Sequence, residues 1–328
     1  MKIGLLKVGQ KVYFNRSCPE VQRSNTNGNF GTYKLFSLLI EKNPNDTFYM
    51  LSDSDLSKGT YPNAYPSIQS LHFLDVIIIV PGILSKTSDK HLLYEMINYP
   101  GKIIILSDDP RCLRSTLPYI PQKPYFIGMQ NDGFVLWKGE VLRGYYVPLE
   151  LAQCYKGELK PIGKKNRDLI VIANTTENNY RTKVLQNLLK GIDAPIFGRL
   201  TEPEKVMLGP EKCVGEVDYK TMQHELATSI STLLVPIKKG LVTSKYIEAI
   251  QNYTVPIFHS DYNTDALELK NYQYIIRNAD ELKQAIKNIR KNPYKTIELL
   301  NKLRFIFVEN NITGDKLNSI IYNIILNN

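Results

Sequence analysis

Short runs of β-branched, apolar residues alternate along this chain with segments in which apolar residues recur at helical spacing. The opening run at residues 2–8 is followed, after a polar stretch, by a helical pattern at residues 33–41. DVIIIV at residues 75–80 and KIIIL at residues 102–106 are further runs of this kind. Such alternation is typical of parallel α/β proteins. We therefore predict an α/β chain with doubly wound sheets.

The alternation continues to the end of the chain. Strands are predicted at residues 2–8, 47–51, 75–80, 102–106, 168–173, 194–197, 231–236, 255–259 and 274–276. Helices are predicted at residues 33–41, 89–97, 180–189, 221–228 and 244–251, and from Asp280, a predicted N-cap, to the C-terminus.

The length predicts more than one domain, because 328 residues exceed the ~100–200 of an ordinary domain. The segment KPIGKKNRD at residues 160–168 combines proline, glycine and charge, as interdomain linkers do. We predict an N-terminal Rossmann-like domain at residues 1–160 and a second one at residues 161–300. The C-terminal helices at residues 301–328 are expected to cross back to the first domain.

The composition is that of a globular protein, with 43% hydrophobic and 22% charged residues. No apolar run approaches the ~20 residues that cross a bilayer, and the four cysteines lack the spacing of a zinc site. The 41 Lys and Arg exceed the 32 Asp and Glu, and the net charge of +9 suits an anionic partner. We expect a cytoplasmic monomer without membrane association.

Residues just after the predicted strands are the candidates for a site, because open α/β sheets bind ligands beyond the carboxyl ends of their strands. Asn27 and Gly28 lie in the loop NGNFGT, which either receives an anion on its backbone amides or is a plain flexible loop. Asp108 and Asp109 follow the strand KIIIL. A carboxylate there either acts as a general base toward a bound hydroxyl or caps the next turn.

Several basic residues stand near these strand ends. Arg111 and Arg114 either pair with the two aspartates or contact phosphate. Arg181 begins the helix after the strand DLIVIA, and is either a diphosphate ligand or an exposed arginine. Lys245 and Glu248 are three residues apart on a predicted helix. Glu248 can accept both hydroxyls of a ribose while Lys245 faces phosphate, or the two form a surface ion pair.

On these residues the chain resembles the two-domain (GT-B) glycosyltransferases, and among them the DNA β-glucosyltransferases of T-even bacteriophages. The resemblance runs in order along almost the whole chain, through the segments MKIGLLKVGQKV, ILSDDPR, RTKVLQNLL, FGR, VGEV and LVTSKYIEAI. It implies two Rossmann-like domains that face a central cleft, and a UDP-sugar-dependent hexosyltransferase. UDP-glucose is the implied donor, and Mg²⁺ or Mn²⁺ is an implied metal.

For the first domain the resemblance implies the acceptor chemistry. It places the catalytic base on Asp109, with Asp108 one residue earlier, and makes Arg111 and Arg114 candidates for contacts with double-stranded DNA. The implied reaction transfers glucose, with inversion, to the hydroxyl of a hydroxymethylated pyrimidine in phage DNA inside the host cell. The target nucleotide must then leave the base stack.

For the second domain the resemblance implies the nucleotide-sugar site. Arg181 matches a diphosphate-binding arginine, and Gly198 lies at a strand-to-loop corner beside the nucleotide. Val217 falls where the family's main chain reads uracil. Lys245 and Glu248 match the residues that hold phosphate and ribose.

The sequence also departs from the family. A second diphosphate-binding arginine falls on Glu177, an acidic residue of the first loop falls on Gly31, and an arginine that binds phosphate is replaced by Lys245. These departures leave the sugar and the acceptor open. The alternatives are a GT-B transferase that acts on a carbohydrate, lipid or small molecule, and a non-catalytic protein that binds a nucleotide sugar or DNA.

Overall fold

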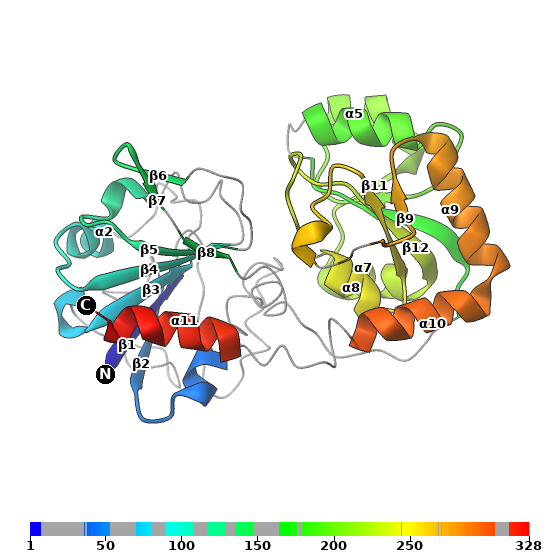
Figure 1. The fold of residues 1–328 in the computed structure, drawn as a ribbon. Coiled ribbons are helices and arrows are strands. Elements are labelled where there is room, and N and C mark those ends of the chain that lie inside the picture. The colour runs from blue at the N-terminus through cyan, green and yellow to red at the C-terminus, as the bar shows by residue number, and fades with distance from the viewer. Residues whose placement is uncertain are drawn as a thin grey trace. The chain divides into compact units, whose positions relative to one another are not determined.

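The structure is a computed structural model that divides the chain into two compact units (Figure 1). One unit comprises Met1–Tyr155 with Thr313–Asn328, and the other comprises Lys156–Ile312. The structure describes residues 1–7, 36, 38–52, 70–80, 90–107, 117–128, 135–142, 144–146, 164–175, 179–243, 245–267, 269, 271–305 and 315–327.

The first unit is built on a six-stranded parallel sheet of order β2-β1-β3-β4-β5-β8. Its strands are β1 (Lys2–Lys7), β2 (Thr47–Ser52), β3 (Val76–Val80), β4 (Lys102–Ser107), β5 (Tyr125–Gly128) and β8 (Gly144–Tyr146). The helix α2 (Lys90–Ile97) precedes β4, and β6 (Val135–Trp137) forms an antiparallel hairpin with β7 (Glu140–Leu142). The strand order reverses direction between β1 and β3, as in doubly wound folds.

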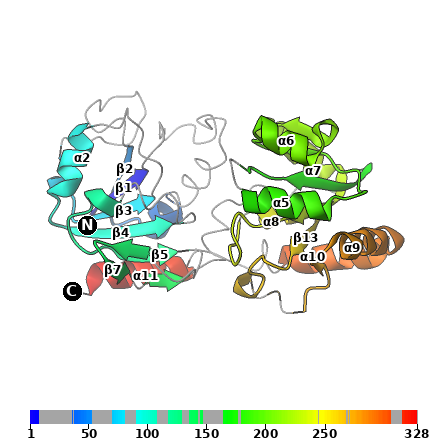
Figure 2. The same ribbon diagram turned by 90° about the horizontal axis from the view of Figure 1, so that it is seen from above.

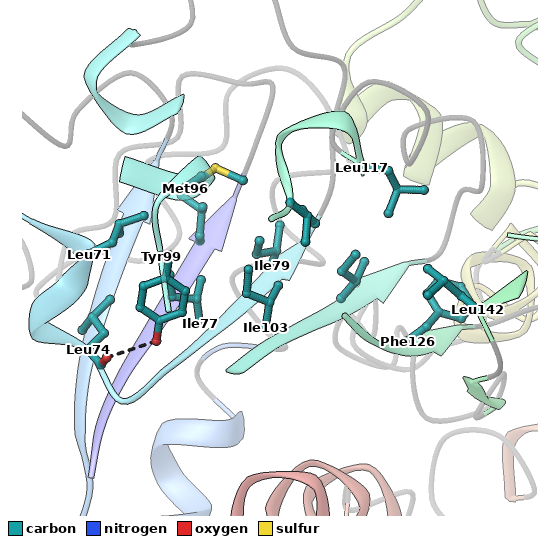
Figure 3. Close-up of a cluster of buried hydrophobic side chains, with 13 residues drawn as sticks. Leu71, Leu74, Ile77, Ile79, Met96, Tyr99, Ile103, Leu117, Phe126 and Leu142 are labelled. Carbon is teal, nitrogen blue, oxygen red and sulfur yellow. Dashed lines mark hydrogen bonds between the residues drawn. The ribbon is translucent and has the colours of Figure 1, made fainter. Parts of the chain in front are cut away.

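The core of this unit lies against one face of the sheet (Figure 3). Alternate residues of β3 and β4 point into it, among them Ile77, Ile79 and Ile103. The Tyr99 hydroxyl donates to the Leu74 carbonyl at 3.0 Å within the same core. Every residue of β3 is buried, because the other face of the strand is covered as well.

The last helix, α11 (Asp315–Leu326), belongs to the first unit and lies beside its sheet (Figure 1). The Lys102 ammonium at the start of β4 donates to the carbonyl oxygens of Ile324, Ile325 and Asn327 at 2.8–3.2 Å. A lysine so placed satisfies carbonyls that a helix C-terminus leaves without partners. The Tyr322 hydroxyl donates to Asp46, which also holds the N-terminal ammonium.

The second unit has its own six-stranded parallel sheet, of order β11-β10-β9-β12-β13-β14. Its strands are β9 (Arg167–Ile172), β10 (Ile196–Phe197), β11 (Cys213–Gly215), β12 (Ser229–Leu234), β13 (Val255–His259) and β14 (Ile275–Ile276). This is the doubly wound order with its switch point between β9 and β12.

Six helices within the described part of this unit surround the sheet. They are α5 (Asn179–Leu188), α6 (Glu202–Leu208), α7 (Tyr219–Ala227), α8 (Lys245–Gln251), α9 (Ala279–Lys291) and α10 (Pro293–Arg304). The helices α7 and α8 pack on each other and against β12, whereas α5 packs on α6 and α9. Figure 2 shows α9 and α10 adjacent to one another.

The predicted α/β class and parallel sheets are confirmed, and each predicted strand and helix has a counterpart in the described residues. The predicted N-cap at Asp280 is wrong. Asn278 caps α9, because its backbone is extended and its side chain accepts from the Glu281 amide at 2.9 Å, which leaves Asp280 in the first turn. The elements β5, β6, β7, β8, β11 and α6 were not predicted. Across the described stretches, no helix is long and apolar enough to span a bilayer.

Candidate functional site

The carboxyl ends of the second sheet carry five of the predicted site residues. Arg181 follows β9, Gly198 follows β10 and Val217 follows β11. Lys245 and Glu248 both follow β12. The other predicted site residues lie outside the described residues: Asn27, Gly28, Asp108, Asp109, Arg111 and Arg114. The geometry of the site therefore rests on the second unit.

Position 198 requires a glycine because two strand ends approach each other closely there. Its φ is +138°, and a Cβ at this position would lie 2.2 Å from the Ala173 carbonyl oxygen. The Gly198 amide donates to the Gly215 carbonyl at 2.8 Å, and the Arg199 amide donates to Asn174 Oδ1 at 2.9 Å. The glycine thus draws the ends of β9, β10 and β11 together into one backbone-lined corner.

Val217 follows this corner and leads into α7. Its side chain packs against a buried cluster of Ile170, Phe197 and Leu226. The next residue, Asp218, caps α7 by accepting from the Thr221 amide at 2.7 Å. Packing on one side and the cap on the other fix the path of the main chain at Val217.

Lys245 and Glu248 form an ion pair, but not the surface pair that their spacing allows. The Lys245 ammonium lies 3.1 and 3.0 Å from the two carboxylate oxygens of Glu248. The Glu248 side chain is only 4% exposed, whereas that of Lys245 is 25% exposed. The carboxylate is therefore buried under a lysine that reaches the surface.

A buried amide pair fixes this ion pair relative to Val217. The Asn252 Nδ2 atom donates to Gln223 Oε1 on α7 and to the Glu248 carbonyl on α8, both at 2.7 Å. Lys245 also approaches the Met222 sulfur on α7, at 3.8 Å. The helix that follows Val217 and the helix that carries Glu248 are thus held as one block.

Arg181 lies in the first turn of α5, directly beyond β9. The residue is buried, with 6% exposure, and its Nη1 atom donates to the Asn174 carbonyl at 2.9 Å. Asn174 is the same residue whose side chain holds the Arg199 amide. The guanidinium is thereby tied to the corner that Gly198 makes, and the interpretation of Arg181 as an exposed arginine is wrong.

A further group of polar residues lies at this edge, outside the predicted site. Asp261, two residues after β13, accepts from the Tyr180 hydroxyl at 2.6 Å, and its amide donates to His259 Nδ1 at 3.3 Å. Burial lowers the pKa of His259, although the nearby Asp261 carboxylate opposes this. The available signal was the polar sequence HSD after an apolar strand, the same signal that singled out Asp108 and Asp109.

The described residues do not fit a metal site. In this part of the chain, no three His, Cys, Asp or Glu side chains come together as a metal would require.

No protein-family model and no curated protein sequence matches the chain. Solved structures are similar to it. A structure of the DNA-modifying enzyme β-glucosyltransferase matches with a TM-score of 0.72, 17% identity and 99% of each chain covered. The T4 phage enzyme in complex with UDP-glucose gives 0.73, 16% and 99% of each chain. The Anabaena protein HepE in complex with UDP and glucose gives 0.58, 11% and 98% of each chain.

These likenesses cover nearly the full length of the chain, and they agree with the two sheets described above. Each unit has six parallel strands in a doubly wound order. The chain therefore has the two-domain α/β GT-B fold.

Proposed function

We propose that this chain is a glycosyltransferase that uses a UDP-sugar. The observation that carries the proposal is the buried Lys245–Glu248 pair at the carboxyl edge of the second sheet. Burying a carboxylate costs free energy even when it is paired, so a buried pair is weak evidence for stability alone. Its position at the ligand-binding edge of a doubly wound sheet favours a ligand. Structures with the same fold hold UDP-glucose or UDP.

Each residue of this edge then has a role toward the donor. The main chain at Val217 reads uracil, and Glu248 accepts from the two hydroxyls of the ribose. Lys245 and Arg181 face the diphosphate, where their charges stabilise the leaving UDP. Gly198 has no side chain, so the nucleotide can approach the backbone of this corner closely.

The proposed acceptor is the hydroxymethyl group of a modified pyrimidine in double-stranded DNA, and the proposed sugar is glucose. As the acceptor oxygen attacks the anomeric carbon, its proton passes to the Asp109 carboxylate and the bond from the anomeric carbon to UDP breaks. A single displacement of this kind inverts the anomeric centre. Arg111 and Arg114 contact the DNA backbone in this proposal. A phage-infected cell is the setting in which such DNA occurs.

A divalent cation can assist UDP departure, and a structure of the T4 phage enzyme contains UDP and Mn²⁺. Because the described residues do not fit a metal site, the proposal assigns no step to the cation. Loss of activity in a chelator, restored by Mn²⁺ or Mg²⁺, would reveal such a requirement.

Radiolabelled UDP-glucose and three matched DNA duplexes test the proposal. The duplexes contain hydroxymethylcytosine, hydroxymethyluracil or only ordinary bases. Label is expected on a hydroxymethylated duplex and not on the ordinary one. Absence of label from all three, together with DNA binding that does not weaken with salt, would contradict the DNA substrate. Transfer to a carbohydrate, lipid or small molecule would then identify another acceptor.

The replacement Asp109→Ala tests the general base. Loss of a positioned base lowers turnover by about 10²–10⁴-fold, so transfer is expected to fall by this factor while UDP affinity measured by calorimetry stays unchanged. Asp108→Ala is the matched control and should retain turnover. The opposite pattern would assign the base to Asp108.

A further inference from the structure

Three consecutive side chains in the first turn of α5 are each bonded to a different segment that follows a strand of the second sheet. The Tyr180 hydroxyl donates to Asp261 Oδ2 at 2.6 Å, beyond β13. Arg181 donates to the Asn174 carbonyl at 2.9 Å, beyond β9. The Thr182 hydroxyl donates to Glu204 Oε1 at 3.1 Å, on α6 beyond β10. One helical turn is thus tied to three strand ends.

On the β13 side the acceptor is itself held in place. The hydrogen bond from Tyr180 is the main reason that the pKa of Asp261 lies below its usual range. The Lys239 ammonium lies 3.6 Å from Asp261 Oδ1, and the Gly240 amide donates to the Asp261 carbonyl at 2.8 Å. Asp261 is therefore a charged and fixed acceptor for the Tyr180 hydroxyl.

On the β10 side the acceptor is a buried carboxylate with several donors. Glu204 is 4% exposed, and its Oε2 atom accepts from the Thr201 amide at 2.8 Å and from the Thr201 hydroxyl at 2.9 Å. The bond from the Thr201 amide is one half of the capping box that starts α6; in the other half the Thr201 side chain accepts from the Glu204 amide. Its Oε1 atom accepts from Thr182, so the beginning of α6 holds the beginning of α5.

The two acids act from opposite sides of Arg181. In the strand order, β10 lies on one side of β9 and β13 lies on the other side, beyond β12. A single tie would let the first turn of α5 pivot, whereas ties on both sides fix its rotation and its distance from the sheet. Displacing a binding group by about 1 Å can cost a large factor in catalysis, so such fixation has functional value.

We propose that Tyr180–Asp261 and Thr182–Glu204 are two positioning pairs that aim Arg181 at the diphosphate of the nucleotide donor. The inference rests on the proposed function and assigns a role to four residues that neither contact the reacting atoms nor lie in the predicted site. It predicts a specific change in ligand preference. Loosening the turn weakens binding of the second phosphate, and leaves binding of uracil, ribose and the first phosphate unchanged.

Calorimetric titration with UDP and with UMP tests this predicted change in Tyr180→Phe, which removes only a hydroxyl. The dissociation constant for UDP is expected to rise about 5–10-fold, because the loosened guanidinium loses part of one charge-assisted hydrogen bond to the second phosphate, and that for UMP less than about 2-fold. Thr182→Val is expected to act in the same direction. An unchanged UDP affinity in Tyr180→Phe, or equal losses for UDP and UMP, would overturn the inference.

Tyr272→Phe is the matched control, because Tyr272 also donates a buried hydroxyl, at 2.8 Å to the Pro256 carbonyl near the start of β13. It should lower the melting temperature without changing the ratio of the UDP and UMP dissociation constants. A change in this ratio as large as that of Tyr180→Phe would overturn the inference, because any lost hydroxyl would then suffice.

A double-mutant cycle shows whether the effect passes through Arg181. In an Arg181→Gln background, Tyr180→Phe is expected to change UDP affinity less than about 2-fold, because the group that it positions is gone. Full additivity of the two changes would overturn the inference. If the wild-type protein binds neither UDP nor UMP, the proposed function is overturned and this inference with it. If the wild type prefers UDP over UMP and Tyr180→Phe has the same UDP affinity as the wild type, only the inference is overturned.

Discussion

Helices α6 and α8 each carry a lysine and a glutamate three residues apart, and the two pairs differ in almost everything except spacing. On α6, Lys205 lies 2.6 Å from Glu202, whose side chain is 82% exposed. On α8, Lys245 lies 3.0 Å from Glu248, whose side chain is 4% exposed. The shorter contact belongs to the exposed pair. Distance and spacing therefore do not distinguish a surface ion pair from a candidate ligand group, whereas burial and position in the sheet do.

The physical reason is the surrounding medium. Water and salt screen the exposed pair, and such pairs contribute little to stability. The carboxylate of Glu248 is buried away from water, so removal of Lys245 would leave it unpaired with a large desolvation cost.

Glu248→Ala is expected to have the largest effect. Removing the carboxylate takes away two hydrogen bonds to the ribose, so the dissociation constant for UDP should rise about 100-fold in calorimetry. The Lys245 ammonium also loses its partner, but its side chain reaches the surface, so the free energy of unfolding should fall by only about 1 kcal/mol in urea titrations. Unchanged UDP affinity would return Glu248 to a purely structural role.

Glu204→Ala tests a buried acid on the helix that carries the exposed pair. It removes the capping box of α6 and leaves the Thr201 and Thr182 donors without their carboxylate. The free energy of unfolding of the second unit is expected to fall by about 2 kcal/mol, which lowers the melting temperature of a unit of this size by about 4–8 °C. A loss as small as that of Glu202→Gln would show that burial does not separate these two acids.

The pH dependence of stability sharpens the same contrast. Burial alone would raise the pKa of Glu204, but hydrogen bonds from Thr175, Thr201 and Thr182 hold that pKa below the ordinary 4.5. The unfolded chain then binds a proton more readily than the folded protein does. The resulting stability is fully present above pH 4.5 and is lost as the pH falls through the pKa of the folded state.

The stability difference between wild type and Glu204→Gln is therefore expected to shrink on acidification. Urea titrations at several pH values between 7 and about 3 measure this difference. A difference that stays constant over the whole range would contradict the lowered pKa of Glu204.

Glu202→Gln should have the smallest effect. The glutamate is exposed and its pair with Lys205 is screened, so melting temperature and UDP affinity should both match the wild type at low and at high salt. A loss of UDP affinity in this variant would place α6 in the nucleotide site and remove the distinction drawn between the two helices.

Most of the fold could be predicted from local pattern. The strand β13 has the predicted bounds, Val255–His259, because a short apolar run between polar residues is long enough for a strand but too short for a helix. The helix α6 was missed because its seven residues include a proline and two glutamates and give only a short apolar pattern. The predicted division between residues 300 and 301 falls inside α10, because no local signal separates α10 from α11, and these two helices belong to different units.

The site could be predicted only in part. Lys245 and Glu248 were found from their spacing, but every described residue from Tyr246 to Gln251 is buried, so no polar stripe marks which face of α8 meets the ligand. The pair of Tyr180 and Asp261 joins residues 81 positions apart, and only the folded sheet brings them together. The identity of the general base rests on residues outside those that the structure describes.

The most direct test of the central claim, that Glu248 holds the ribose of a uridine nucleotide, compares UDP with 2′-deoxy-UDP in wild type and in Glu248→Gln. Calorimetry of the wild type is expected to show about 10-fold tighter binding of UDP, the value of one hydrogen bond to a buried carboxylate. In Glu248→Gln the preference should fall below about 3-fold, because a neutral amide accepts more weakly. Equal affinity for the two nucleotides in the wild type, or a full preference that survives in Glu248→Gln, would contradict the claim.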